Sequence, residues 1–533
     1  MELITTLWQF IQNATTAQFE AFWAKFPLHS ADFWQALWAS LWPRDGHMEF
    51  TTFTFWAFLA ICAFFSYLLP RVTRPLWLLV CSYGFYLYSR TGVQLVAVLI
   101  GATVITYLAG IAVGRLQNLW ARRAFLWLAV LSSVGILGFY KYANFLRRTA
   151  ADIAGLFGAD SSVSMLDIPA VLGLSYFTFQ SLGYVIDVYK GKIAPEKNPL
   201  YYALYVSFFP CIVTGPIERA GHLLPQLRSP VPFNYNRVAG GLFRMLWGVF
   251  KKLVIAGNLS LFTKEIFTHM QRYNGLVLAL GALAFSYQLY MDFSGYCDIA
   301  IGAGRVLGFE LLENFKRPFA SRSYGELWAR WHISLSSWFR DYVYIPLGGS
   351  RCSTPRHMAN LMVTFLVSGL WHGDSTGYVV WGALNGVFVC VGKLTGKKRQ
   401  ALAAHNPLYK LRFVKALIQC SCVYLLFSVC MVFFAASFYG GGLADGFYLL
   451  GHLGASGAGL SQLVFGKLGL SAGLVWAVAL SALFVELGEK WGRPDLVIRK
   501  IWFIGRWPLY YLMIAVILVF GNLGASGSVY GTF

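Results

Sequence analysis

Long runs of uncharged, apolar residues recur along this chain of 533 residues. The six clearest runs occupy residues 50–70, 92–114, 124–140, 416–443, 468–485 and 507–521. An α-helix needs about 20 apolar residues to cross roughly 30 Å of hydrocarbon. Only 12% of the residues are charged, against about 25% in soluble domains. With the shorter runs between them, these segments predict an all-α polytopic membrane protein with about 11 transmembrane helices plus re-entrant or interfacial helices.

The net charge of +20 would suit a nucleic-acid-binding surface if the basic residues shared one face. Instead, Lys and Arg cluster at the ends of the apolar runs, which is typical of cytoplasmic loops of membrane proteins. The alternation of basic and neutral loops places the N-terminus outside the cytoplasm, and the basic residues between 490 and 506 place the C-terminus there too. We therefore expect the chain to contact a lipid bilayer and no nucleic acid.

Three regions can be distinguished along the chain. Residues 1–47 have aromatic side chains at helical spacing, which predicts an interfacial amphipathic helix or, alternatively, a docking surface for a partner. Residues 48–400 form a motif-rich body, and residues 401–533 hold further transmembrane helices and an extracytoplasmic tail. The nine cysteines form no paired metal-binding motif, so we expect no metal site.

The stretch 314–356 interrupts the membrane pattern with seven basic residues. Within it, residues 326–342 have helical periodicity, and one apolar stripe contains Leu327, Trp331, Leu335, Trp338 and Tyr342. We expect one half-buried helix on the cytoplasmic side. Its arginines fit either an ordinary cytoplasmic loop or a site for an anionic cofactor, because guanidinium groups match phosphates.

Two histidines, His332 and His372, lie in apolar and tryptophan-rich surroundings. An ionisable group at membrane depth costs roughly 2.5–3.5 kcal/mol on insertion, so such groups are usually kept for chemistry or for lining a cavity. For each histidine alone, a hydrogen-bonded core residue is the alternative. The presence of both makes the pair the best lead to function.

Acidic residues in the same body have two interpretations each. Asp292 and Asp298 lie in an apolar run and could hydrogen-bond a histidine or the arginine cluster. A structural ion pair with Arg305 is the alternative. Glu218 and Arg219 suggest an ion pair within a loop, and lining of the substrate path is the alternative.

Several motifs together resemble the signature of the membrane-bound O-acyltransferases, and in particular the bacterial alginate and peptidoglycan O-acetylation branch. The motif Trp-Ala-Arg-Trp-His-Ile-Ser-Leu-Ser at 328–336 carries most of the likeness, and further matches lie at 176–180, 184–189, 209–217, 291–302, 339–349 and 369–382. The resemblance is dense over residues 48–400. Many relatives have a histidine where Asn385 stands, so a third histidine is not required here.

The resemblance implies an acyltransferase of the bacterial inner membrane. It would take acetyl from cytoplasmic acetyl-CoA, a substrate rather than a tightly bound cofactor, and deliver it for O-acetylation of an extracytoplasmic polysaccharide such as peptidoglycan or an alginate-like polymer. A separate extracytoplasmic SGNH-type acetyltransferase would complete the transfer. The alternatives are D-alanyl or other acyl transfer to an envelope polymer, and a non-enzymatic transporter or scaffold, with the histidines as a proton relay in a transporter.

The resemblance also implies roles for single residues. His372 is the expected base that takes the proton of the acceptor hydroxyl, and His332 would orient or polarise the thioester or act as a second base. Tyr530, in a terminal Tyr-x-x-Phe motif, would relay the acyl group, or else anchor the tail at the interface. We expect donor binding by Arg330, Arg340, Arg317, Trp331 and Ser336, and a substrate path or support for the histidines from Asp292, Asp298, Trp371 and Asn385.

Overall fold

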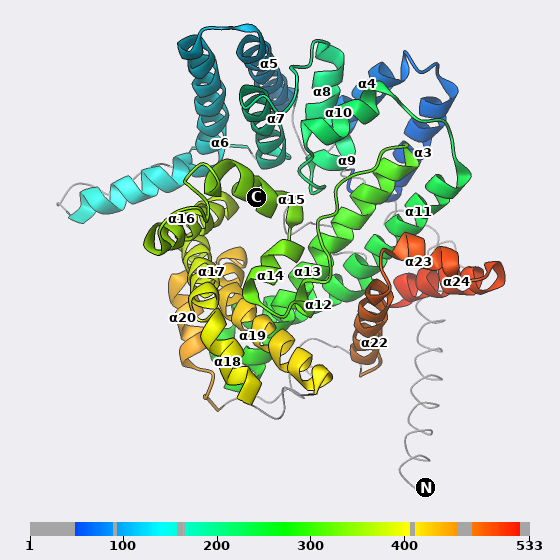
Figure 1. Ribbon diagram of the computed structural model, residues 1–533. Coiled ribbons are helices and arrows are strands. Elements are labelled where there is room, and N and C mark those ends of the chain that lie inside the picture. Colours follow the sequence, from blue (N-terminus) through cyan, green and yellow to red (C-terminus); the bar gives the residue numbers. More distant parts are fainter. Residues whose placement is uncertain are drawn as a thin grey trace.

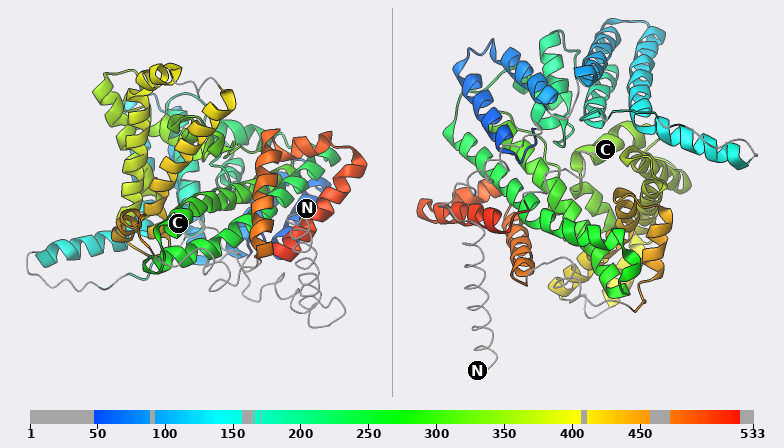
Figure 2. Two further views of the ribbon diagram at one scale, coloured as in Figure 1. Left: turned by 90° about the horizontal axis from the view of Figure 1, so that it is seen from below. Right: turned by 180° about the vertical axis from the view of Figure 1, so that it is seen from behind.

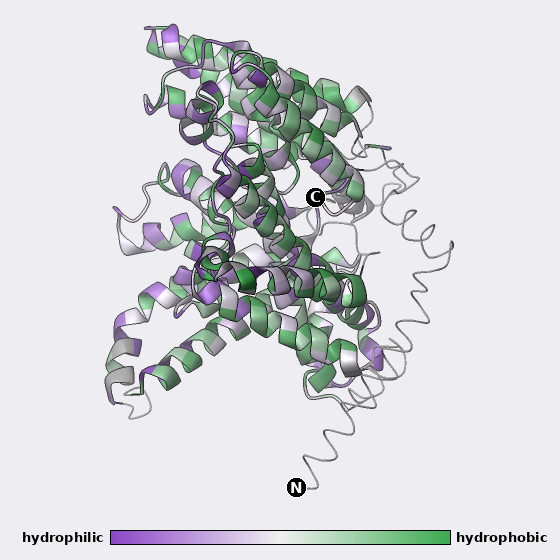
Figure 3. Ribbon diagram, turned by 90° about the vertical axis from the view of Figure 1, so that its right-hand side faces the viewer, coloured by the Kyte–Doolittle hydropathy of each residue, from purple (hydrophilic) through white to green (hydrophobic). Residues whose placement is uncertain are grey.

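The computed structural model describes residues 48–88, 93–156, 164, 166–169, 171–405, 411–456 and 472–522, and no β-strand forms within these ranges. Helices of very different length surround a central pair, α11 and α13 (Figure 1). Hydrophobic residues run along the helices, and hydrophilic residues gather at helix ends and in loops (Figure 3). The predicted all-α class is confirmed. The interfacial segment 1–47 lies outside the described residues.

Among the described residues, six helical segments are long and apolar enough to cross a membrane. They are Leu95–Arg115, Leu119–Ala151, Tyr235–Thr268, Gly275–Val306, Thr376–Leu394 and Arg412–Phe438. Two shorter apolar helices, Phe53–Leu68 and Ile504–Phe520, accompany them. This arrangement confirms a polytopic membrane protein, whereas the larger predicted number of spans and the boundaries of the three regions stay predictions.

The central pair consists of α11 (Tyr235–Phe250) and α13 (Gly275–Val306), and α11 continues through the π-helix η1 (Lys251–Ala256) into α12 (Gly257–Thr268). The side chain of Asn234 accepts a hydrogen bond from the backbone at the start of α11 and so caps that helix. The two helices cross at glycines. A β-carbon at Gly241 would lie 2.7 Å from the backbone oxygen of Gly302, and one at Gly302 would lie 2.6 Å from the oxygen of Gly241. Only glycine therefore allows this approach.

The N-terminal helices form one side of the molecule (Figures 1 and 2). They are α3 (Phe53–Leu68), α4 (Arg74–Tyr88), α5 (Val93–Arg115), α6 (Leu119–Leu156), α7 (Leu174–Tyr189), α8 (Pro199–Ser207), α9 (Phe209–Ile212) and α10 (Ala220–Arg228). Helix α5 packs against both α6 and α7. Within this group, α6 and α7 both reach Trp371, which precedes His372 at the end of the helix Thr354–His372.

The C-terminal half supplies two further groups. The hairpin of α16 (Thr354–His372) and α17 (Thr376–Leu394) packs on α19 (Arg412–Phe438), with α18 (Gly396–His405) and α20 (Leu443–Gly451) beside it. The second group contains α22 (Ala472–Lys490), α23 (Pro494–Lys500) and α24 (Phe503–Phe520) and contacts α11 and η1. The short 3₁₀ turns η2 (Met270–Arg272) and η3 (Pro318–Ala320) connect neighbouring elements.

The predicted single helix over residues 326–342 is wrong. The segment is broken into α14 (Tyr324–Arg330), α15 (Ile333–Phe339) and the π-helix η4 (Arg340–Tyr344), and His332 lies at the break. The break divides the predicted apolar stripe. Leu327 and Trp331 join the main hydrophobic core, whereas Leu335 and Trp338 join a second, smaller core. Periodicity identified the buried face correctly but could not reveal the break.

Candidate active site

His332 occupies the turn between α14 and α15 with a left-handed backbone, φ 43° and ψ 55°. Arg317 is the only other non-glycine residue with a positive φ in the described part of the chain. Such backbones cost about 1–3 kcal/mol for most residues and cluster at functional sites. The imidazole is buried and lies 4.6 Å from the ring of Phe293 on α13. Burial lowers the pKa of His332 to about 3, so the ring is neutral at physiological pH.

His372 is the last residue of α16 and is buried among aromatic rings. The ring centres of Trp381 and Phe434 lie 4.8 and 5.2 Å from that of the imidazole. Trp371 contacts both histidines, with ring centres 4.8 Å from His372 and 6.2 Å from His332. Two histidines that are 40 residues apart in the sequence thus meet around one indole. The sequence predicted both residues and this tryptophan, but not their proximity.

Lys141 on α6 holds Trp371 in place. Its ammonium group donates a hydrogen bond to the backbone oxygen of Trp371 and lies 5.3 Å from the centre of the indole ring. The hydroxyl of the neighbouring Tyr142 donates to the backbone oxygen of Leu370. Lys141 was not among the residues predicted from the sequence, although a lysine directly after a long apolar run is a visible signal.

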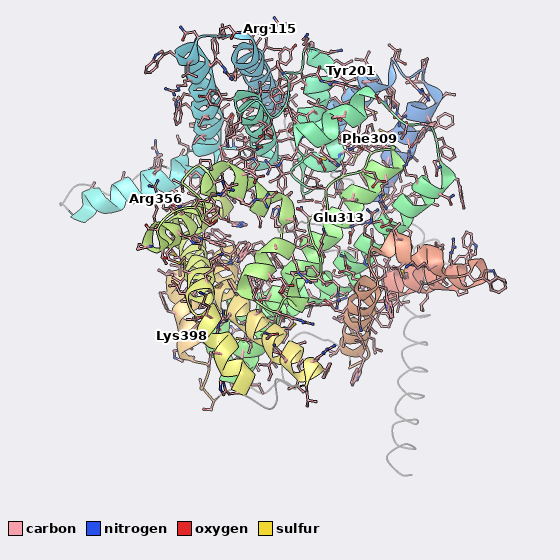
Figure 4. All side chains as sticks on the ribbon, in the orientation of Figure 1. Arg115, Tyr201, Phe309, Glu313, Arg356 and Lys398 are labelled. Carbon is pink, nitrogen blue, oxygen red and sulfur yellow. The ribbon has the colours of Figure 1, made fainter. Side chains whose placement is uncertain are left out.

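The predicted donor-binding residues lie in different places. Arg317 and Arg330 line one cavity of about 450 Å³, together with Lys316. Arg340 does not line this cavity. Its side chain is 62% exposed and pairs with Asp341 at 2.9 Å. The cavity also reaches Glu313, which lies beside α13 (Figure 4).

Trp331 and Ser336 do not line this cavity either. The indole of Trp331 is buried in the main core, with ring centres of Phe315 and Phe427 at 5.2 and 4.9 Å. The hydroxyl of Ser336 donates a 3.1 Å hydrogen bond to the backbone oxygen of Trp331. Trp331 and Ser336 thus stabilise the turn that carries His332.

The acidic residues pair with cations that the sequence analysis did not name. Asp292 accepts from Lys252 at 2.6 Å. Asp298 contacts Arg244 at 2.7 Å and Lys251 at 2.6 Å, so the alternative pairing of Asp298 with Arg305 is wrong. All of these contacts join α13 to α11 and η1.

Two neighbouring predictions also need correction. Arg305 pairs with Glu310 at 2.8 Å and with Asp495, from α23. Glu218 and Arg219 do not pair with each other. Glu218 contacts His222 at 2.7 Å, and Arg219 contacts Asp341 at 3.2 Å. Some of these partners are local, as in Glu218–His222, whereas Asp341 and Asp495 come from distant parts of the chain.

Asn385 is buried, and both ends of its amide are hydrogen-bonded. Its oxygen accepts a 2.6 Å hydrogen bond from the hydroxyl of Tyr324, and its nitrogen donates to the backbone oxygen of Trp381 at 2.7 Å. The bond from Tyr324 joins α14 to α17. Tyr530 lies outside the described residues. Among the residues that are described, no group of three His, Cys, Asp or Glu side chains is placed to hold a metal ion.

Comparisons with known proteins decide the family. The model of the MBOAT (membrane-bound O-acyltransferase) family matches residues 193–436, which include both histidines. A probable alginate O-acetylase AlgI of Pseudomonas putida is 38% identical over 341 residues, which are 64% of this chain and 69% of the relative. The chain belongs to the membrane-bound O-acyltransferase family. It is therefore a multi-pass bacterial membrane protein of an acyltransferase family, as the motifs predicted.

Other relatives of this acyltransferase carry different names. A peptidoglycan O-acetyltransferase of Helicobacter pylori is 34% identical over 59% of this chain and 64% of its own length. A teichoic acid D-alanyltransferase of Bacillus subtilis is 29% identical over 41% of this chain and 58% of its own length. The chain spans about two thirds of the length of the alginate relatives that it matches.

Proposed function

We propose that this acyltransferase takes acetyl from acetyl-CoA at the cytoplasmic face of the inner membrane and delivers it for O-acetylation of a cell-envelope polysaccharide. The observation that carries the proposal is the meeting of His332 and His372 around Trp371, in a buried centre whose neighbours are mostly aromatic. The names of the alginate and peptidoglycan relatives support acetyl as the group and an envelope polymer as its destination.

The chemistry follows from the surroundings of the two histidines. Transfer of acetyl from a thioester to a hydroxyl requires a base for the hydroxyl proton while the new ester bond forms and the thiolate leaves. His372 is the proposed base. His332 is neutral, so one ring nitrogen can donate a hydrogen bond and the other can accept one, which suits it to orient the thioester. The aromatic walls keep water away, which favours transfer over hydrolysis.

Arg317 and Arg330 are the proposed contacts for the phosphates of the donor, because both line the cavity with Lys316. Only a short segment separates this cavity from the turn of His332. Asn314 and Phe315 both line the cavity, and the ring of Phe315 lies 5.1 Å from that of Phe293, which contacts His332. A donor with its anionic end in the cavity would therefore lie close to the histidines.

The remaining parts of the proposal concern the extracytoplasmic side. A tail that begins after the last helix and carries Tyr530 would present the acyl group to a separate SGNH-type acetyltransferase, which modifies the polymer. Both termini would lie outside the cytoplasm, in keeping with the distribution of basic residues. The teichoic acid relative makes D-alanyl transfer the second candidate function, with the same histidines and a different donor.

The test uses the full chain in detergent with acetyl-CoA labelled in the acetyl group, and compares wild type with the His372→Ala variant. We expect wild type to release CoA and to retain label, and His372→Ala to do neither. Label mapped to Tyr530 would support the relay. If both proteins release CoA equally, His372 is not the base. If neither does so, even when the partner enzyme and polymer are supplied, acetyl-CoA is not the donor, and transport, scaffolding or D-alanyl transfer takes precedence.

A further inference from the structure

Asn314 holds the turn that carries His332, and we infer that it is a positioning residue for the proposed acyl transfer, on which this inference rests. The side chain of Asn314 is fully buried. Its backbone oxygen accepts a 2.9 Å hydrogen bond from the backbone nitrogen of Ile333. Its amide oxygen accepts two more, from the nitrogen of Ser334 at 3.1 Å and from its hydroxyl at 2.7 Å. One asparagine thus binds the two residues that follow His332.

These hydrogen bonds replace those of a continuous helix. In an α-helix, the nitrogen of Ser334 would donate to the backbone oxygen of Arg330, four residues earlier. Here that oxygen accepts from the nitrogen of Lys316 at 3.0 Å, and Ser334 donates to Asn314. Residues 314–316 therefore bond to the backbone groups that would otherwise bond to one another in a continuous helix across His332. The left-handed backbone of His332 is a consequence of this exchange.

The sequence of the segment favours the alternative conformation. Residues 326–342 carry one apolar stripe at helical spacing, and a continuous helix would relieve the strain at His332. A straight helix would also turn the imidazole to a different direction, since the break sets the orientation of α15 relative to α14. The hydrogen bonds of Asn314 are what opposes this change. Their contribution to catalysis is therefore geometric.

Asn314 is itself fixed from the other side. Its amide nitrogen donates to the sulfur of Cys297 on α13 at 3.2 Å, and that thiol donates to the backbone oxygen of Thr214 at 3.4 Å. The hydroxyl of Ser334 accepts a 3.0 Å hydrogen bond from the nitrogen of Ile217. The turn is thus tied to α13 and to the segment before α10. Asn314 also lines the donor cavity, so one residue forms part of both sites.

The experiment measures kcat and KM for acetyl-CoA per folded molecule of the full chain. Asn314→Leu removes the amide at similar size, whereas Asn314→Asp keeps the oxygens that Ser334 uses. We expect kcat of Asn314→Leu to fall on the order of 10²-fold, as for a misplaced catalytic group, with a much smaller change in KM. Asn314→Asp should retain most of the wild-type kcat. A folded Asn314→Leu protein with the wild-type kcat would overturn the inference.

Asn258→Leu is the matched control, because Asn258 is another buried asparagine whose amide bonds two backbone oxygens, those of Val254 and Phe520. This variant should lose stability but keep kcat per folded molecule. If Asn314→Leu does not fold, Ser334→Ala removes the hydroxyl bonds alone, and Ser334→Thr should restore kcat. Loss of kcat in Ser334→Ala without recovery in Ser334→Thr, or equal loss in Asn258→Leu, would contradict a positioning role. If the proposed function is wrong, the wild-type protein itself does not turn over acetyl-CoA, and this result distinguishes that failure from failure of the present inference.

Discussion

Two regions inside this acyltransferase contain ionisable groups, and the surroundings of these groups differ. Aromatic rings surround them in one region, and opposite charges contact them in the other. The histidine centre places His332 and His372 among the rings of Phe293, Trp371, Trp381 and Phe434. The ionic cluster, formed by Arg244, Lys251, Asp298, Glu313 and Glu489, pairs each cation with two of its carboxylates. Its nitrogen–oxygen distances run from 2.6 to 3.0 Å.

The two regions have different expected roles, one mainly in catalysis and the other mainly in folding. Oppositely charged groups in the ionic cluster stabilise each other. Removal of one group leaves its partner as a buried, uncompensated charge. The ionic cluster joins α11, η1 and α13 to α22. Its residues also line the donor cavity, so its loss should mainly affect folding and, to a smaller extent, KM for the donor. The histidine centre contains the residues that we propose for proton transfer. We therefore expect mutations in the two regions to have different measurable effects, mainly on kcat in the histidine centre and mainly on stability in the ionic cluster.

The largest expected effect is that of His372→Ala on turnover. Loss of a general base lowers rates by about 10²–10⁴-fold, and CoA release from acetyl-CoA should fall by that amount. The unfolding temperature should change little by comparison, because the histidine is outside the ionic cluster. A variant that unfolds at much lower temperature while its folded fraction remains active would show that His372 stabilises the fold and is not the base.

The second prediction concerns the ionic cluster. Asp298→Asn leaves Arg244 and Lys251 each with one carboxylate fewer, and breaking a buried pair costs about 3–5 kcal/mol of stability. Thermal unfolding in detergent should show this loss. Asp298 lines the donor cavity and not the histidine centre, so KM for acetyl-CoA can change while kcat per folded molecule at saturating donor stays at the wild-type value. Asp445→Asn, a change at the less buried start of α20, is the control and should be far milder. Normal stability with lost activity would make Asp298 part of the chemistry.

A smaller effect is expected at the donor cavity. Arg317→Gln or Arg330→Gln should raise KM for acetyl-CoA about tenfold, as for loss of one hydrogen bond to a charged group. The KM for acetyl-pantetheine, which lacks the nucleotide, should not change. Arg356→Gln removes an arginine that does not line this cavity and serves as the charge control. Equal changes with both donors would argue against phosphate binding in the cavity.

The smallest effect should be seen at His222, outside both regions. A hydrogen bond to the Glu218 carboxylate raises the pKa of His222 above its ordinary 6.5. A raised pKa means that the pair stabilises the fold below pH 6.5 and that this contribution disappears as pH rises through the folded-state pKa. Unfolding temperatures of wild type and His222→Gln should therefore differ at acidic pH and converge at alkaline pH. A difference that grows with pH would show that His222 acts as a neutral group.

The sequence predicted the buried face of residues 326–342 but not its division. Leu327 and Leu335 share one helical stripe in the sequence, yet they lie in different hydrophobic cores because the chain breaks at His332. The break depends on Asn314, whose hydrogen bonds with Ile333 and Ser334 reach across about 20 residues of sequence separation, beyond what local periodicity can report. The contact of Lys141 with Trp371 was not predicted for the same reason, because the two residues are 230 positions apart in the sequence.

The sequence by itself determined the helical membrane class, the family and the two histidines, because apolar runs of spanning length and a dense set of motifs are local properties. Only the tertiary structure decided which residues meet: His332 with His372 around Trp371, and Asp298 with Arg244 and Lys251 rather than Arg305. The physical reason is that buried charges and strained turns are satisfied by partners in space, and helix packing, not distance along the chain, sets which partners are near.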